Sequence, residues 1–224
     1  MSSDVPFSKE ETFIRANTAI GTPSLVPEIK LYLAGEVTPL WHATEATLAQ
    51  SQLPPPYWAF AWPGGQALAR HLLDHPALIA GKDVLDIGAG SGLLAIAAKK
   101  AGATRVTAAE IDAFAVAAIR LNAALNDVAI ETESRDLIGG ASRWDTILVG
   151  DMCYERPLAE RLTAWLRALA ARGATVLLGD PGRAYLPHDG LTEIARYTVP
   201  TSLDLEDRTT RETVIWQLGG TIAI

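Results

Sequence analysis

A regular alternation of short apolar runs and helix-like segments, between Gly81 and Asp180, constrains the fold of this chain more than any other feature. Apolar runs of this length are typical of strands that are covered on both faces. Strands that alternate with helices form right-handed βαβ units, so we expect a mostly parallel sheet with helices on both faces. The expected strands lie in the segments DVLDIGAG, RVTAAE, AIETES, DTILVGD and TVLLGD.

The C-terminal region has a different pattern. The segments RYTVPTSLDLE and RETVIWQLG are predicted to be two successive strands with few residues between them. Such a short connection is typical of an antiparallel hairpin, which we expect at one edge of the sheet. We expect one domain over residues 1–224, with an N-terminal helix, a strand and an aromatic lid in 1–60 and the catalytic core in 61–224.

Two elements are predicted ahead of the core. Ser8 followed by Glu11 makes a capping box, so a short helix is expected from Ser8 to Asn17. Apolar and more polar residues alternate in PEIKLYLAG, which predicts a strand. The next segment, QLPPPYWAFAWPGG, is too rich in proline for regular structure and carries an aromatic cluster. Such a cluster suits a lid over a site and simple core packing equally well.

Charge and composition narrow the possible partners. The formal net charge is -7, which repels polyanions and disfavours nucleic acid as a ligand. One cysteine cannot form an internal disulfide, as suits a reducing compartment. The first residues show no apolar signal region, and no apolar run reaches the ~18 residues that a membrane span needs. We therefore expect a cytoplasmic, monomeric protein that binds neither membrane nor nucleic acid.

The segment DIGAGSGLL places Gly88, Gly90 and Gly92 where a strand turns into a helix. Glycines let the backbone bend tightly and let a ligand approach the peptide groups, near the N–H donors of the helix N-terminus. A dinucleotide fold would show the spacing G-x-G-x-x-G, whereas the spacing here is G-x-G-x-G. The glycines alone are also compatible with a purely structural turn.

Two acids follow the next strands. Glu110 ends the second strand about 20 residues after the glycines, where an acid can accept hydrogen bonds from both ribose hydroxyls of a nucleoside. Asp136 follows the third strand and could reach an adenine amino group, although a solvated loop carboxylate explains it equally well. Asp112 is explained by capping the helix that it precedes.

These motifs together resemble a known family. VLDIGAGSG with Glu110 is similar to motifs I and II of the seven-stranded methyltransferases that use S-adenosylmethionine. PYWAFAWPGGQALARHLL, GDMCYE and LLGDPGR resemble the protein-lysine methyltransferases with a D-x-x-Y motif after the fourth strand. Within that branch, the chain is most similar to the electron-transfer-flavoprotein β-subunit lysine methyltransferases. The likeness includes NTAIGTPSLVPEIKLYL and so covers most of the chain.

The resemblance implies a Rossmann-like seven-stranded sheet with an antiparallel C-terminal strand, S-adenosylmethionine as cofactor and the electron transfer flavoprotein β subunit as protein substrate. No metal is implied. We expect the cofactor to be lined by Trp62, which would close over it, Gly88, Gly90, Gly92, Glu110 and Asp136. We expect Trp58, Asp151 and Tyr154 to form the lysine channel, with Asp151 and Tyr154 as the catalytic residues. Arg183 follows the fifth strand, where it could bind substrate at the mouth of the crevice, although a Pro-Gly turn with a solvated arginine explains it equally well.

The D-x-x-Y segment fits lysine methylation chemically. A carboxylate at Asp151 can accept a hydrogen bond from the incoming amine, and the ring of Tyr154 can hold its aliphatic stem and cationic head. Asp151 is not expected to be a strong general base unless burial raises its pKa. Cys153, between them, is predicted to be a spacer, because only Arg156 is nearby in sequence to activate a thiol.

Other interpretations remain open. His71 and His75 have a spacing suited to metal ligands, but Leu72 stands where a metalloprotease motif needs glutamate, and the last turn of a helix explains both histidines. An enzyme of this fold could instead act on another protein or on a small amine. A nicotinamide-dependent oxidoreductase and a non-enzymatic module that binds the cofactor are the alternatives of other classes.

Overall fold

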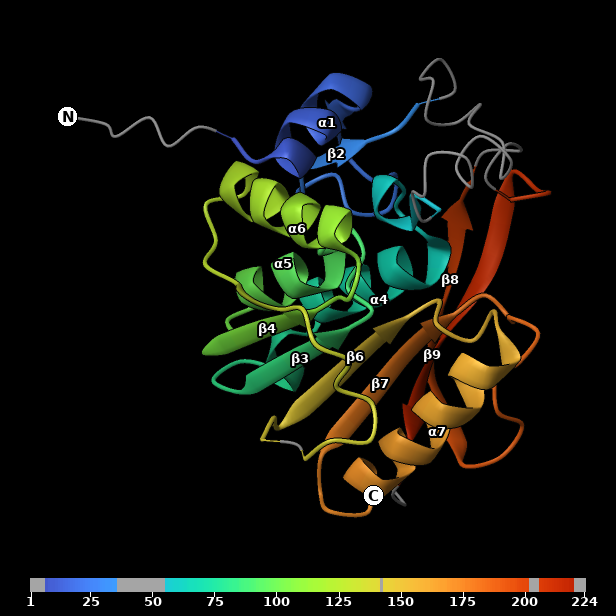
Figure 1. Ribbon diagram of the computed structural model, residues 1–224. Helices are drawn as coiled ribbons and strands as arrows, with labels where there is room; N and C mark the ends of the chain where they lie inside the picture. Colours follow the sequence, from blue (N-terminus) through green and yellow to red (C-terminus); the bar gives the residue numbers. More distant parts are fainter. Residues whose placement is uncertain (1–6, 36–54, 142, 202–205, 220–224) are drawn as a thin grey trace.

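The computed structural model describes residues 7–35, 55–141, 143–201 and 206–219. A seven-stranded sheet has the order β5-β4-β3-β6-β7-β9-β8 (Figure 1). Its strands are β3 (Asp83–Ile87), β4 (Arg105–Ala109), β5 (Glu131–Glu133), β6 (Thr146–Gly150), β7 (Thr175–Asp180), β8 (Leu191–Pro200) and β9 (Thr210–Leu218). The pairs among β3 to β7 are parallel, and β9 pairs antiparallel with both β7 and β8. The predicted mostly parallel sheet with an antiparallel C-terminal hairpin is confirmed.

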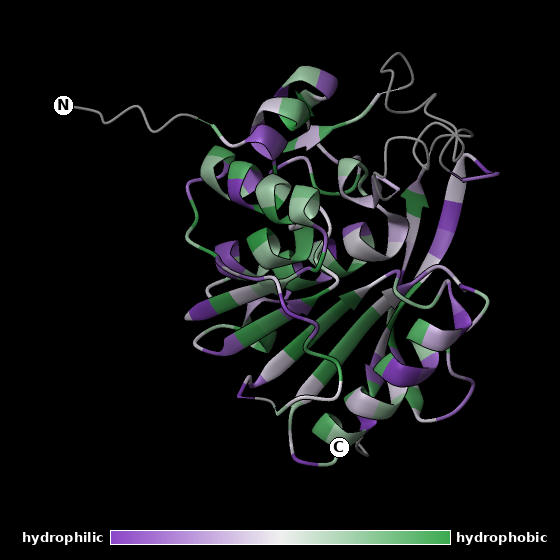
Figure 2. Ribbon diagram, viewed as in Figure 1, coloured by the Kyte–Doolittle hydropathy of each residue, from purple (hydrophilic) through white to green (hydrophobic). Residues whose placement is uncertain are grey.

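Helices cover both faces of this sheet. Figure 1 shows α4, α5 and α6 on one face and α7 on the other. Val84 of β3 packs in the apolar layer beneath α4 and α5, whereas Leu85 and Ile87 of the same strand pack beneath α7. The central strands are apolar along most of their length (Figure 2), as expected for a sheet buried on both faces. The helices are α4 (Pro63–Asp74), α5 (Leu93–Lys100), α6 (Ala113–Leu125) and α7 (Arg156–Ala170), with the short 3-10 turns η1 (Tyr57–Ala59) and η2 (Pro76–Leu78).

The N-terminal elements form a small layer against α6. Helix α1 (Lys9–Asn17) begins after Ser8, and the reciprocal bonds of the predicted capping box to Glu11 are both present. Strands β1 (Ala19–Gly21) and β2 (Leu31–Leu33) pair antiparallel, separately from the main sheet. Helix α1 and strand β2 both pack on α6, and residues 52–54 of the proline-rich segment lie outside the described part of the chain.

The strand register aligns the ends of the parallel strands. Ile87 at the end of β3 pairs with Ala109 at the end of β4, and Gly150 at the end of β6 pairs with Gly179 of β7. The residues that follow these strands are therefore brought to one edge of the sheet, where parallel sheets bind ligands. Asp151 follows Gly150 directly in the chain.

Some predicted boundaries differ from the structure, and β2 for example covers only Leu31–Leu33 of the predicted PEIKLYLAG. Strand β8 begins at Leu191, five residues before the predicted segment, and its pairing with β9 shifts register between Glu193 and Ala195. The shift disturbs the alternation of apolar and polar residues, which hid this half of the strand from sequence patterning. Strand β5 covers only Glu131–Glu133 of the predicted AIETES. Within the described ranges, every helix is too short or too polar to cross a membrane.

Candidate active site

The glycine-rich turn between β3 and α5 requires glycine at the predicted positions. Gly88, Gly90 and Gly92 have φ angles of +65°, +51° and +78°, in the left-handed region that favours glycine. A Cβ atom added to Gly88 would lie 2.2 Å from Sδ of Met152. Gly92 is also the N-terminal cap of α5. The turn therefore brings bare backbone to the edge of the sheet.

Glu110 is held by the backbone around it. Its Oε2 accepts a hydrogen bond from the amide of Gly90 at 3.1 Å, and its Oε1 accepts from the amides of Ile111 and Asp112 at 2.8 and 3.2 Å. Burial raises the pKa of this carboxyl, and the three N–H groups oppose that effect. A carboxylate has about four acceptor positions, so Glu110 keeps about one for another donor. If Glu110 bound both ribose hydroxyls, as predicted, one hydroxyl would have to share an acceptor position with a backbone amide.

A cavity of about 290 Å³ opens beside the glycine turn and Glu110. It brings together most of the residues that the sequence singled out, from five separate parts of the chain. Its lining residues are Tyr57, Trp62, Gly88, Gly90, Glu110, Gly150, Asp151, Met152, Tyr154 and Arg183. Gly92 is not in this lining, since it caps the helix behind the turn.

Asp136 lines a second, adjoining cavity of about 150 Å³. Gly88, Glu110 and Met152 border both cavities, so the two are neighbouring compartments. Asp136 accepts a hydrogen bond from Arg161 at 2.7 Å, and this guanidinium holds the pKa of the carboxyl below its usual value. The remaining walls of this compartment are largely apolar, with Ile87, Ala109, Ile111, Leu137, Ile138 and Leu158.

Asp151 is buried and has an unusual backbone for a residue other than glycine, with φ at +56°. Its Oδ2 accepts a hydrogen bond from the amide of Gly65 at 3.2 Å, and its Oδ1 accepts from Nε and Nη2 of Arg183 at 3.0 and 2.7 Å. Burial raises the pKa of the Asp151 carboxyl to about 6, while Arg183 lowers it and Asp180 adds to the rise. Asp151 is therefore mostly ionised at neutral pH.

The segment WPGG has a structural role that the sequence pattern did not reveal. A Cβ atom on Gly64 would lie 2.1 Å from the carbonyl oxygen of Gly179 and 2.5 Å from Oδ2 of Asp151. The first turn of α4 can therefore approach β7 only because both residues are glycine. This approach places the amide of Gly65 against the Asp151 carboxylate, near the positive end of the helix dipole.

Arg183 joins Asp151 to a residue that sequence analysis missed. Its Nη2 donates to Oε1 of Glu206 at 2.6 Å as well as to Asp151, and its guanidinium lies 5.7 Å from the ring centre of Trp62. Glu206 is a buried acid in the connection between β8 and β9. No local motif marks its contact with Arg183, which stands in the turn after β7.

Aromatic side chains form another part of the cavity lining. Tyr154 is 42% exposed, and its ring centre lies 5.6 Å from that of Tyr57. Tyr57 in turn contacts Trp62 edge to face, and its carbonyl accepts a hydrogen bond from Nε1 of Trp62 at 2.9 Å. The rings of Tyr57, Trp62 and Tyr154 are the aromatic wall of the cavity.

Trp58 is placed differently from the sequence prediction. It was expected to line the lysine channel, but it is only 2% exposed and stacks on Phe114 of α6. The 3-10 turn over Tyr57–Ala59 directs neighbouring side chains in different directions, and Tyr57 takes the position in the cavity wall instead. The structure thus places Tyr57, and not Trp58, in the lining of this cavity.

Two weaker candidates are also placed. Cys153 is buried, and burial raises the pKa of its thiol to about 12, so the prediction of an unreactive spacer is supported. His71 lies beside His75 and bonds through Nδ1 with the hydroxyl of Tyr197 at 3.0 Å. Among the described residues, no group of three or more potential metal ligands is present.

Comparisons with known proteins give the family. The family model for ribosomal protein L11 methyltransferase (PrmA) matches residues 68–149. An electron transfer flavoprotein beta subunit lysine methyltransferase from Danio rerio is 40% identical over 215 residues, which cover 92% of this chain and 82% of the relative. The relative of the same name from Mus musculus is 37% identical over 93% of this chain and 84% of its own length. The chain belongs to the family of these electron transfer flavoprotein beta subunit lysine methyltransferases.

It is an S-adenosylmethionine-dependent protein-lysine methyltransferase. The solved structure of a magnesium protoporphyrin IX methyltransferase from Synechocystis, with bound S-adenosylmethionine, aligns with a TM-score of 0.53 and 19% identity over 70% of this chain and 80% of that one. The ribosomal protein L11 methylase from Lactobacillus delbrueckii aligns with a TM-score of 0.51 and 22% identity over 72% of this chain and 81% of its own. At these identities the likeness shows the fold, which agrees with the predicted Rossmann-like methyltransferase sheet.

Proposed function

We propose that this enzyme methylates lysine ε-amines of the electron transfer flavoprotein β subunit, and that Asp151 orients the incoming amine. The names of the relatives, at 36–40% identity over most of this chain, support that partner. The observation that carries the proposal is the position of Asp151, which lines the same cavity as Gly88, Gly90 and Glu110.

The cavity residues fit the cofactor. Gly88 and Gly90 bring backbone without side chains to the cavity, which suits close approach of the amino acid part. Glu110 has an acceptor position left for a ribose hydroxyl, and the apolar compartment beside Asp136 suits a flat base. Trp62 would cover the site from the side of α4. We propose these residues as the cofactor site, with Asp136 at its far end.

Asp151 would guide the amine without deprotonating it. The cofactor supplies a methyl group on a positively charged sulfur, and the amine nitrogen must approach that methyl in line with the bond to sulfur. A free lysine has a pKa of about 10.4, roughly four units above that of Asp151, so the carboxylate is too weak a base to take the proton. It can accept an N–H bond from the neutral amine and so aim the lone pair of the nitrogen.

The hydrogen bonds of Asp151 leave a place for that contact. Gly65 and Arg183 supply three donors from the described residues, and a carboxylate has about four acceptor positions. Two of those donors bind Oδ1 and one binds Oδ2, so the remaining position is on Oδ2. The aromatic wall of Tyr57, Trp62 and Tyr154 would hold the aliphatic stem, and cation–π attraction would hold the cationic form.

The test is methyl incorporation from labelled S-adenosylmethionine into purified electron transfer flavoprotein, with mass spectrometry of the β subunit. Wild-type enzyme should label lysine, and Asp151→Asn should reduce the rate at least about a hundredfold because the amine loses its charged acceptor. Asparagine also tolerates the left-handed backbone at this position. S-adenosylhomocysteine should bind the variant as it binds the wild type.

Each other result identifies what is wrong. Labelling at wild-type rate by Asp151→Asn would remove Asp151 from the mechanism. No labelling of the flavoprotein by an enzyme that binds S-adenosylhomocysteine would reject this partner, and other proteins and small amines would then be screened with the same assay. Equal loss of cofactor binding and transfer in the variant would move Asp151 to the cofactor site.

A further inference from the structure

We propose that Glu206 is a positioning residue for methyl transfer, which holds Arg183 in the orientation that fixes the Asp151 carboxylate. This inference rests on the proposed function, because it takes Asp151 as the group that receives the amine. Glu206 does not line the cavity, so it acts through Arg183 and touches neither substrate.

Glu206 is an almost fully buried acid between two guanidinium groups. Its side chain is 3% exposed. Its Oε1 lies 2.6 Å from Nη2 of Arg183, and its Oε2 lies 2.9 Å from Nε of Arg211. A buried carboxylate is retained only where charged partners compensate the loss of water, and here two arginines do so.

The guanidinium of Arg183 is held along two of its edges. Nε and Nη2 donate to Asp151, whereas Nη1 and Nη2 face Glu206, at 3.4 and 2.6 Å. The guanidinium is rigid and planar, so contacts on two edges fix its plane as well as its position. With the Glu206 edge released, Arg183 would keep its hydrogen bonds to Asp151 and its contact with the Trp62 ring, and its guanidinium could rotate together with the Asp151 carboxylate. The acceptor on Oδ2 would then lose its fixed direction.

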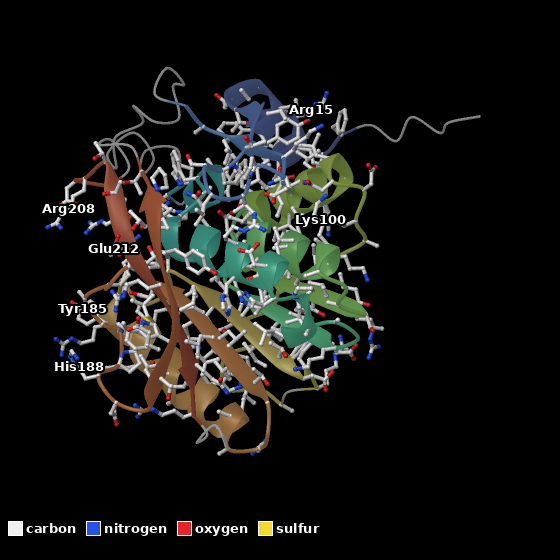
Figure 3. All side chains as sticks on the ribbon, turned by 180° about the vertical axis from the view of Figure 1, so that it is seen from behind. Arg15, Lys100, Tyr185, His188, Arg208 and Glu212 are labelled. Atoms are coloured by element: carbon white, nitrogen blue, oxygen red, sulfur yellow. The ribbon has the colours of Figure 1, made fainter. Side chains whose placement is uncertain are left out.

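The main chain on either side restricts Arg183 but does not aim its guanidinium. Oδ1 of Asp180 accepts from the amides of Gly182 and Arg183, both at 2.7 Å, which fixes the turn after β7. Several rotatable bonds lie between that turn and the guanidinium. Glu206 reaches it from the β8–β9 hairpin, and Figure 3 shows Arg208, two residues further on, at the edge of the molecule. The β8–β9 hairpin is thus connected to Asp151 through the contact between Glu206 and Arg183.

The charges around Asp151 give this link a measurable signature. Arg183 from the turn after β7 lowers the pKa of Asp151, Asp180 at the end of β7 raises it, and the neighbouring Cys153 thiol stays neutral. Substituting Glu206 removes a negative charge that shares Nη2 of Arg183 with Asp151, while Arg183 keeps its hydrogen bonds to Asp151, so the pKa of Asp151 falls. Activity requires the ionised carboxylate, so the acidic break in kcat/KM moves to lower pH. A residue that only stabilises the fold would not move that break.

The experiment compares Glu206→Ala, Glu206→Gln and the control Asp207→Asn in the full-length enzyme with electron transfer flavoprotein as substrate. Asp207 is the next residue and also pairs with Arg211, but it is 73% exposed and has no contact with Arg183 among the described residues. We expect Glu206→Ala to lower kcat roughly ten- to a hundredfold and to move the acidic break of kcat/KM to lower pH. Glu206→Gln keeps one acceptor oxygen and should be intermediate in both, and Asp207→Asn should match the wild type. S-adenosylhomocysteine affinity should be unchanged in all three.

Three results would overturn the proposal. One is a Glu206→Ala variant whose kcat and whose acidic break in kcat/KM both equal those of the wild type. Another is a lower kcat in both Glu206 variants with the break unmoved, which is a purely structural effect. If Glu206→Ala does not fold, wild-type behaviour of Glu206→Gln also rejects it. Asp151→Asn is measured in parallel, so that failure of the proposed role of Asp151 can be told from failure of the role of Glu206. Retained transfer in Asp151→Asn rejects the role of Asp151 itself. Lost transfer in Asp151→Asn together with wild-type Glu206 variants rejects only the role of Glu206.

Discussion

The two carboxylates of the cavity are held in different ways. Within the described part of the chain, Glu110 and Asp151 each accept three hydrogen bonds, but all three donors to Glu110 are backbone amides. Two of the three donors to Asp151 belong to the Arg183 side chain, which itself depends on Glu206. We call the first region the cofactor half (Gly88, Gly90 and Glu110) and the second the acceptor half (Gly65, Asp151 and Arg183).

This difference predicts different sensitivity to mutation. Backbone amides cannot be removed by substituting side chains, so the geometry of the cofactor half depends mainly on glycine at the turn. The acceptor half depends on side chains and on one close approach between α4 and β7. Changes in the acceptor half should therefore abolish transfer while sparing cofactor binding. The following four experiments examine the contact between α4 and β7 that supports the acceptor half, and then the two halves themselves.

The largest effect is expected from Gly64→Ala. The added Cβ would lie 2.1 Å from the carbonyl oxygen of Gly179, which is backbone and cannot turn away. We expect the free energy of unfolding to fall by about 3 kcal/mol, measured by urea denaturation. Gly65→Ala is the matched control, because its Cβ would meet nothing nearer than a Leu93 methyl at 3.9 Å. Equal stability of the two variants would contradict the tight contact between α4 and β7.

The pH profile is expected to show the next largest effect. The fraction of neutral lysine amine falls about tenfold per pH unit on the acid side of its pKa. Below about pH 6 the Asp151 carboxylate is also lost, so kcat/KM should fall about a hundredfold per unit. Initial rates between pH 5 and 8 measure this break, with circular dichroism to check folding. A constant slope through pH 6 would mean that ionised Asp151 is not needed.

Glu110→Gln tests the cofactor half directly. The amide group keeps one carbonyl oxygen for the backbone donors but loses the charge, so we expect S-adenosylhomocysteine to bind roughly three- to tenfold more weakly. The rate at saturating cofactor should change little. Isothermal titration calorimetry measures the affinity, and Glu131→Gln, at an exposed position outside both cavities, is the control. A large loss of kcat at saturation would remove the separation between the halves.

The smallest effect is expected from Asp136→Asn. The pair between Asp136 and Arg161 is about half exposed on both sides, and such pairs contribute little to stability. We expect S-adenosylhomocysteine affinity to change by no more than about twofold, measured by the same calorimetry. A tenfold loss would instead indicate a direct bond between Asp136 and the base, which would extend the cofactor half to the second compartment.

The cofactor half was predictable because its information is local. A strand, three glycines and an acid after the next strand lie within one short stretch, and each has a physical reason to be there. The capping box at Ser8 and the cap at Asp112 were predicted for the same reason.

The acceptor half was only partly predictable. Asp151 and Tyr154 were predicted through a resemblance and Arg183 from its position after a strand, but nothing local indicated that Glu206 would hold Arg183. The choice between Tyr57 and Trp58 depends on the geometry of a 3-10 turn, which composition does not specify. The bulge between Glu193 and Ala195 likewise arises from pairing across the hairpin.

The close approach of Gly64 to Gly179 also has a consequence for folding. The amide of Gly90 and the carboxylate of Glu110 are separated by 20 residues, whereas Gly65 and Asp151 are separated by 86. Contacts between distant residues form late, because a long loop must close first. Asp151 thus gains its bond from Gly65 only when α4 docks on β7. A partly folded chain could therefore bind cofactor before it is able to transfer a methyl group.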